Sequence, residues 1–185
     1  MKQPNIVFYF SDQQRWDTMG CYGQKLNVTP VLDALSREGM LFENAFTCQP
    51  VCGPARACLQ TGLYAAEAGA HVNHRILPEG ADTLARRLIA GGYETAYVGK
   101  WHLASCEGSS YRTVAVPPER RGGYQYWMAA DALEFTSHGY NGYVFDGDMK
   151  RHDLWATAWT ASTPSPWTTS TNTPRGRGTS RFSSS

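Results

Sequence analysis

Apolar residues form two short continuous runs in the first hundred positions, and each run leads into polar side chains. Residues 4–10 (PNIVFYF) and 93–98 (YETAYV) are rich in aromatic and β-branched residues, which is typical of strands buried on both faces of a parallel sheet. The first run continues into SDQQRWD and the second into GKWHL. We therefore predict two buried strands whose carboxyl ends present polar groups at one sheet edge, where open α/β sheets bind ligands.

Three further segments carry helix signals. Thr29 before a proline suits an N-cap and predicts a short helix over residues 31–38. Residues 81–90 place apolar side chains at helical spacing before a Gly-Gly pair, and residues 52–61 run from Cys-x-Pro to a following glycine. This order of elements predicts an α/β fold with a mostly parallel central sheet flanked by helices.

The chain changes character near residue 150. Beyond it Thr, Ser, Pro, Gly and Arg dominate and no apolar period survives, so this segment cannot bury a core. We divide the chain into a partial domain, residues 1–150, and a tail, residues 151–185, that is disordered or the product of a frameshift. Within the domain we expect residues 41–46 to form a short strand or extended link. Residues 111–149 are expected to form long loops with no more than one short strand.

The candidate chemistry centres on residues 52–64, CGPARACLQTGLY. Cys52 stands directly before the predicted helix start, where Pro54 suits the first helical position, and Arg56 follows Cys52 by four residues. A side chain there meets free backbone N–H groups and the positive end of the helix dipole, so an anion can bind beside it. The competing interpretation is a half-buried cysteine before an ordinary helix.

Taken together, three segments resemble the N-terminal portion of the formylglycine-dependent sulfatase family, within the alkaline-phosphatase-like superfamily. Residues 52–62 match the family motif of cysteine, x-P-x-R, a short helix and T-G. Residues 4–17 resemble the family's first strand and metal loop, and residues 99–102 resemble its G-K-W-H segment. The resemblance extends over residues 4–149, with all three motifs in family order.

This resemblance implies a sulfuric ester hydrolase. A formylglycine-generating maturation enzyme would oxidise Cys52, and the hydrated aldehyde would be an activated nucleophile. Arg56 would hold the nucleophile and a sulfate oxygen, and Lys100 would bridge the nucleophile and the sulfate. His102 would donate to the reacting oxygens or relay a proton near them. Cys48 fails the motif because no arginine follows it at the fourth position.

The resemblance also implies Ca²⁺ or another divalent cation, held by Asp12, Gln13 and the modified Cys52. Most sulfatases carry a second aspartate where this chain has Gln13. A glutamine there resembles phosphonate monoester and phosphodiester hydrolases of the same superfamily, which we keep as an alternative. The family's second acidic metal segment is not found in this sequence, so a catalytically inactive, truncated fragment that binds an anion is a further alternative.

Other residues offer weaker candidates. Asp17, Asp146 and Asp148 would add oxygen ligands, although solvated loop carboxylates are the simpler interpretation of each. A zinc site is a rival whose spacing fits no common finger; its ligands would be Cys48, Cys52, Cys58, His71 and His74. Arg15 and Trp16 follow the metal loop and would face the substrate, although Trp16 suits a core position equally well.

Length, charge, hydropathy and cysteine count limit the kinds of protein that this chain can be. The 185 residues carry a formal net charge of +1, which favours neither a nucleic-acid nor a membrane partner. No run approaches the roughly 18 apolar residues of a membrane span, and the first strand leaves no room for a signal peptide. Five cysteines argue against a disulfide framework. We expect a cytoplasmic protein whose substrate is a small-molecule or carbohydrate sulfate ester, and the sequence leaves the particular ester open.

Overall fold

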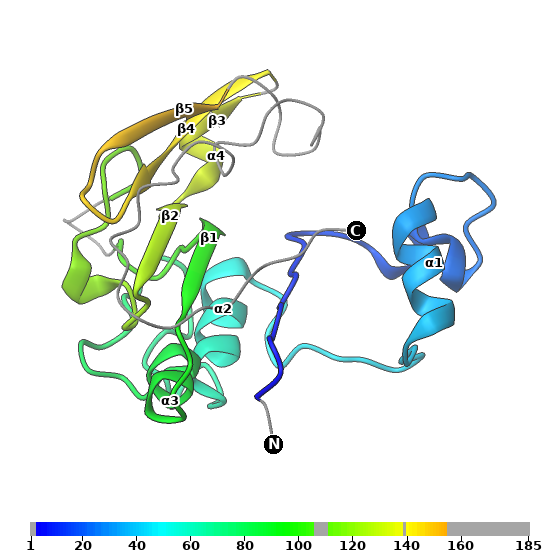
Figure 1. The fold of residues 1–185 in the computed structure, drawn as a ribbon, viewed down its shortest axis with the longest axis horizontal. Coiled ribbons are helices and arrows are strands. Elements are labelled where there is room, and N and C mark those ends of the chain that lie inside the picture. The colour runs from blue at the N-terminus through cyan, green and yellow to red at the C-terminus, as the bar shows by residue number, and fades with distance from the viewer. Residues whose placement is uncertain (1–2, 106–110, 139, 155–185) are drawn as a thin grey trace.

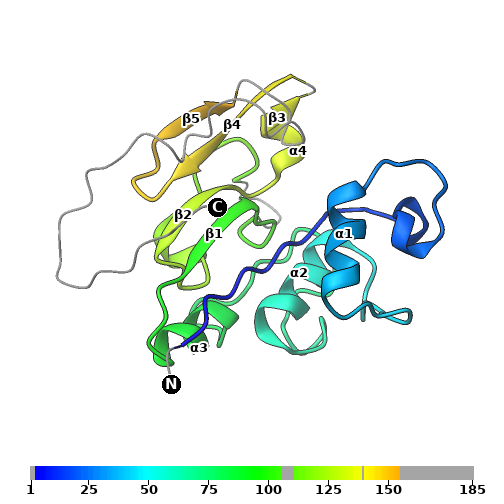
Figure 2. The same cartoon turned by 45° about the vertical axis from the view of Figure 1, so that its right-hand side comes forward.

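A computed structural model describes residues 3–105, 111–138 and 140–154 of the chain (Figure 1). The strands in these ranges form one mixed sheet, with helices α2 and α3 beside it, and a small lobe around α1 lies apart (Figures 1 and 2). The predicted α/β class is confirmed. The helices are α1 (Pro30–Glu38), α2 (Cys52–Thr61), α3 (Leu84–Ala90), α4 (Leu133–Thr136), and the short 3₁₀ turns η1 (Trp16–Thr18), η2 (Gly20–Tyr22) and η3 (Pro118–Arg120).

The sheet has the order β1-β2-β4-β3, and β5 pairs with β4. Only β1 and β2 run parallel, and the other pairs are antiparallel. The β4–β5 pair is a hairpin, and a short hairpin loop joins antiparallel strands, whereas parallel strands need a long crossover. The strands are β1 (Ala96–Lys100), β2 (Tyr126–Ala130), β3 (Ser137–His138), β4 (Asn141–Asp146) and β5 (Arg151–Leu154).

Residues 4–10 do not form the predicted buried strand. They run without strand pairing among the described residues, and Val7 is 92% exposed. The Gln3 side chain donates to the Gly91 carbonyl oxygen (2.7 Å) before β1, and Asp12 pairs with Lys100 at the end of β1. The segment therefore runs in the same direction as β1. The composition of residues 4–10 favours a strand, but a strand also needs backbone hydrogen bonds to a neighbour, and these residues pair with none of the described strands, although they run beside β1.

Two predicted helices are confirmed and one is shorter than predicted. Helix α1 matches the prediction for residues 31–38. Helix α2 ends before Gly62 as predicted, but it begins at Cys52, which was expected to lie just ahead of the helix. Helix α3 begins only at Leu84 because Thr83 caps it, its hydroxyl accepting from the Arg86 N–H at 3.3 Å. None of the described helices has the length and apolar character that crossing a bilayer requires.

The loop prediction for residues 111–149 is wrong. This region holds β2, β3, β4 and α4. The many Tyr, Gly and Pro residues suggested loops, but these short strands are specified by pairing across the sheet rather than by a local pattern. The predicted strand at 93–98 lies slightly later, as β1, and residues 41–46 form no strand. The sheet continues to Leu154, past the predicted boundary at 150, and the rest of the predicted tail lies outside the described residues.

Aromatic side chains from β1, β2 and the turn after β1 make the centre of the core. Trp101 and Trp127 are almost fully buried, with ring centroids 5.5 Å apart, and Tyr97 stacks on Trp127 at 5.4 Å. The Trp101 indole N–H donates to the Arg120 carbonyl oxygen (3.0 Å). This aromatic cluster holds β1 and β2 together next to Lys100, the last residue of β1.

We expect Trp127→Ala to lower the free energy of unfolding by about 3–5 kcal/mol, because a large buried ring leaves a cavity that cannot collapse. Urea unfolding of the chain followed by circular dichroism measures the loss. Val7→Ala, at a 92% exposed position, is the matched control and should change little. Equal effects of the two substitutions would contradict the assignment of the core.

Candidate active site

The N-terminus of α2 packs tightly against two other segments. The Gly53 N–H donates to the Asn73 side-chain oxygen (3.0 Å), and the Cys52 thiol lies 3.5 Å from the same oxygen. A Cβ at Gly53 would stand only 2.9 Å from that oxygen and 3.6 Å from the His102 carbonyl oxygen. Cys52, the first residue of α2, therefore lies beside the turn that carries His102.

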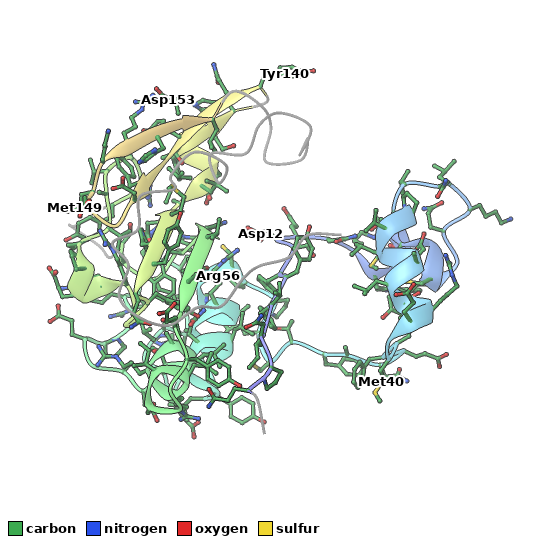
Figure 3. All side chains as sticks on the ribbon, in the orientation of Figure 1. Asp12, Met40, Arg56, Tyr140, Met149 and Asp153 are labelled. Carbon is green, nitrogen blue, oxygen red and sulfur yellow. The ribbon has the colours of Figure 1, made fainter. Side chains whose placement is uncertain are left out.

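Arg56 follows Cys52 by one turn on the same helix, so both side chains lie on one face. Its buried guanidinium donates to the Lys100 carbonyl oxygen and to the Tyr97 hydroxyl, and one nitrogen lies 3.5 Å from an Asp12 carboxylate oxygen. Figure 3 labels Asp12 on the N-terminal segment and Arg56 on α2. The buried Arg56 Nε has no hydrogen-bond partner among the described residues.

Lys100, the last residue of β1, lies between two carboxylates. Its Nζ is 3.0 Å from Asp12 Oδ2 and 3.1 Å from Glu134 Oε2. The Lys100 side chain is only 12% exposed, whereas both carboxylate side chains are 47% exposed. Two cations, Arg56 and Lys100, thus face two anions, and the cluster is formally neutral.

The ion pairs control the protonation of these groups. Burial alone would lower the pKa of Lys100, but Asp12 and Glu134 outweigh burial and leave that pKa raised. Burial would likewise raise the pKa of Asp12, but the hydrogen bond and charge of Lys100 and the charge of Arg56 leave it lowered. The pKa of Glu134 is lowered too, with its own backbone N–H and Lys100 outweighing burial. All are charged at neutral pH.

His102 lies in a turn with an unusual backbone. Its φ of 57° is in the left-handed region, and its backbone N–H donates to the Asp131 carbonyl oxygen (2.7 Å). The buried ring Nδ1 has no protein hydrogen-bond partner within the part of the chain that is described. Burial, and then the charge of Lys100, lower the His102 pKa, so the imidazole is neutral at pH 7 and able to accept a proton.

The Asp131 carboxylate holds the His102 turn in place. It is fully buried directly after β2. One oxygen accepts from the Leu103 and Ala104 N–H groups, and the other accepts from the Ser105 N–H, each at 3.0 Å. The Ser105 hydroxyl donates to the second oxygen as well. These bonds fix the residues immediately after His102 and so constrain the ring's position.

We expect the His102 imidazole to titrate below its ordinary pKa of 6.5. Lys100→Met should raise that pKa by removing a nearby cation, and Glu134→Gln should lower it further by removing an anion. The stability that neutral His102 contributes is then complete above pH 6.5 and is lost as the pH falls toward the folded pKa. NMR titration of the ring protons measures each shift, and shifts opposite to these would contradict the described geometry.

The predicted metal ligands supply only part of a calcium site. Asp12 and Gln13 are adjacent, and the Gln13 N–H donates to Asp12 Oδ1 at 3.1 Å. Gln13 is exposed and has a φ of 27°. Calcium takes six to eight oxygen ligands. Within residues 3–105, 111–138 and 140–154, no three His, Cys, Asp or Glu side chains gather to hold a metal ion, so these residues alone do not complete the site.

The other candidate ligands have different contacts. Asp17 pairs with Arg15 at 2.5 Å, and Asp146 pairs with His152 at 2.6 Å in the β4–β5 hairpin. Trp16 is 68% exposed and packs edge-on against Tyr22. The structure thus engages Arg15 and Trp16 in local contacts near α1.

No three of the proposed zinc ligands gather into one cluster in the described part of the chain. Burial, and then the neighbouring Cys48 thiol, raise the Cys58 pKa to about 11. His74 contacts Arg112 at 3.0 Å, and the backbone oxygen of His71 accepts from the Gln49 side chain.

Four residues of this site escaped sequence reasoning: Asn73, Tyr97, Asp131 and Glu134. Asp131 and Glu134 had one usable signal, because they follow β2, and Ala130 at its end is in register with Lys100. Parallel neighbours end at one edge, so side chains just after β2 reach the same place as those after β1. Asn73 lies in a loop with no local pattern.

The sequence of this chain is similar to known sulfatases. The sulfatase family model matches residues 4–161. An ulvan-active sulfatase from Formosa agariphila is 40% identical over 154 residues, covering 83% of this chain and 29% of the relative. The N-acetylglucosamine-6-O-sulfatase of Bacteroides thetaiotaomicron is 33% identical over 143 residues, covering 75% of this chain and 25% of that enzyme. The chain therefore spans less than a third of the length of these relatives.

Solved structures show the same likeness. The putative sulfatase yidJ from Bacteroides fragilis superposes with a TM-score of 0.72 at 30% identity, over 85% of this chain and 38% of that one. A protein solved with its substrate D-glucosamine-2-N,6-O-disulfate superposes with a TM-score of 0.69 at 29% identity, over 85% of this chain and 29% of that one. By motif, fold and family match, this chain belongs to the sulfatase family and corresponds to its N-terminal part.

Proposed function

We propose that the protein containing this chain hydrolyses sulfuric esters with a formylglycine nucleophile made from Cys52. The observation that carries the proposal is the meeting of three motifs. Gly53, the residue after Cys52, lies against the His102 backbone, and Arg56 on the same helix bonds both to the end of β1 and to Asp12. A nucleophile at a helix N-terminus beside two cations suits attack on an anionic ester.

Each cation has a distinct part in this proposal. The Arg56 guanidinium is held rigidly by its bonds to Lys100 and Tyr97, so its remaining donors would meet sulfate oxygens at fixed positions. The Lys100 ammonium would turn from its carboxylate partners toward the sulfate and the nucleophile. Neutral His102 would accept a proton from the nucleophile or pass one to the leaving alcohol.

A divalent cation, calcium or a similar ion, belongs to the same proposal. Asp12 and Gln13 would provide part of its oxygen ligands, and other ligands would come from residues outside those described. When bound, such an ion neutralises charge that develops on the reacting oxygens. Asp12 now pairs with Lys100 at 3.0 Å, so its use as a metal ligand would leave the Lys100 ammonium available to the substrate.

The proposed substrate is a carbohydrate sulfate. The names of two relatives support this choice, since one is an N-acetylglucosamine-6-O-sulfatase and another was solved with a glucosamine disulfate. A second candidate is a phosphonate monoester or phosphodiester, which is favoured by Gln13 in place of the usual second aspartate. A neutral ligand leaves the metal site one charge more positive.

The test is turnover of paired aryl esters by the natural full-length protein, co-expressed with a maturation enzyme and supplied with calcium. We expect hydrolysis of p-nitrophenyl sulfate to exceed that of p-nitrophenyl phenylphosphonate. The reverse preference would favour the second candidate. Absence of turnover of both aryl esters and of glucosamine 6-sulfate by protein whose Cys52 is converted would contradict the proposal.

A further inference from the structure

Glu134 is a partly exposed charged group of the site that lies outside the predicted motifs. It lies on α4, three residues after Asp131, and its carboxylate is 3.1 Å from the Lys100 ammonium. The Glu134 side chain is 47% exposed and the Lys100 side chain 12% exposed. The exposed part of Glu134 therefore borders the space through which a ligand of Lys100 would approach.

The two carboxylates on Lys100 are not equivalent. Asp12 has a second cation, since Arg56 lies 3.5 Å from the same oxygen. The ion pair recorded for Glu134 is with Lys100, alongside a hydrogen bond from its own backbone N–H. When Lys100 turns toward a sulfate, Asp12 keeps a cationic partner, whereas Glu134 needs new donors. An ionised carboxylate only accepts hydrogen bonds, so the donors that suit it best are hydroxyl or N–H groups of the bound molecule.

The neighbours of Glu134 extend the same border toward Cys52. Phe135, the next residue, is 46% exposed, and the Arg112 guanidinium carbon lies 5.1 Å from its ring centroid. Arg112 contacts His74 at 3.0 Å, and the preceding residue of that loop, Asn73, touches the Cys52 thiol. Helix α4 and this loop thus connect Lys100 to Cys52 around one side of the site.

We propose that Glu134 is a specificity-determining residue that accepts hydrogen bonds from donors on the alcohol part of the ester. It thereby favours sulfates of polyhydroxylated or amino alcohols, such as sugars, over aryl sulfates without such donors. This inference rests on the proposed function, because it assigns Glu134 to the leaving-group side of the same reaction. A site built around a substrate hydroxyl discriminates against analogues that lack it.

The experiment compares two substrates in the mature full-length protein with calcium: glucosamine 6-sulfate and p-nitrophenyl sulfate. The measured quantity is the ratio of their kcat/KM values. Glu134→Gln keeps the shape and one acceptor oxygen but removes the charge, and Glu134→Ala removes the acceptor. We expect the sugar-to-aryl ratio to fall by about 10- to 100-fold in Glu134→Ala, and less in Glu134→Gln, because a charged acceptor is lost.

Glu79→Gln is the matched control, since Glu79 pairs with Arg120 away from the site at 3.0 Å. It should leave the ratio unchanged. Equal losses on both substrates in the Glu134 variants, or a ratio that stays within twofold, would overturn the inference and leave the proposed function intact. Aryl turnover without any sugar turnover in the wild type would also overturn it. Failure of the wild type on both esters would remove the proposed function, and the inference with it.

Discussion

Cys52→Ala should abolish sulfate ester hydrolysis, with kcat falling by at least about 10³-fold in the mature full-length protein. The substitution removes the thiol group that the maturation enzyme would need in order to make the aldehyde at the first residue of α2. Arg56 and Lys100 would still bind an anion, so affinity for inorganic sulfate should persist while turnover disappears. Steady-state kinetics with p-nitrophenyl sulfate, together with sulfate inhibition, measure the two effects separately.

Cys48→Ala and Cys58→Ala are the controls for this result. Both residues flank Cys52 in the sequence, and the thiol that lies 3.5 Å from the Asn73 oxygen is that of Cys52. Neither substitution should lower turnover by more than the change in folded fraction accounts for. Activity that survives Cys52→Ala but not Cys48→Ala would identify Cys48 as the precursor of the nucleophile and contradict the motif assignment.

Asp131→Ala should lower the free energy of unfolding by about 3–6 kcal/mol. The substitution leaves three buried backbone N–H groups and a hydroxyl without their acceptor, and each unsatisfied donor costs about 1–3 kcal/mol. The same bonds hold the residues after His102, so the ring resonances of His102 should broaden or shift in the folded fraction. Urea unfolding of the chain measures the loss of stability.

Asp153→Ala is the matched control for that experiment, because Asp153 pairs with Arg151 on the exposed side of β5. An exposed pair of this kind contributes about 0–1 kcal/mol. If Asp131→Ala cost no more than Asp153→Ala, the carboxylate would have no supporting role in the His102 turn.

The sequence predicted those elements that local signals specify. Helices α1 and α2 have clear ends, with proline near the start and glycine after the last turn, and both formed as predicted. The strand at residues 4–10 and the strands beyond residue 111 depend instead on which backbone edges meet. Residues 4–10 have the composition of a strand but pair with none of the described strands. In contrast, β4 pairs with β2 and β3, which were predicted as loop, and with β5, which lies in the predicted tail.

The same distinction applies to the site. Cys52, Arg56, Lys100 and His102 belong to contiguous motifs and were named from the sequence, and their catalytic roles remain predictions. Asn73, Asp131 and Glu134 reach the site from other segments, through contacts that span at least 20 positions. A single residue with no surrounding motif cannot be assigned to the site from the sequence alone. Asp131 and Glu134 can be assigned only once the register of β1 and β2, which places Ala130 beside Lys100, is known.

The central claim is that Cys52 is the precursor of the nucleophile, and mass spectrometry of the peptide that contains it tests this most directly. After co-expression with a maturation enzyme, the Cys52 peptide should be lighter by about 18 Da, the difference between a CH₂SH group and an aldehyde. The same peptide from Cys48→Ala and Cys58→Ala should show the same loss, and Cys52→Ala should show none. An active full-length protein whose Cys52 remains an unmodified thiol would contradict the account.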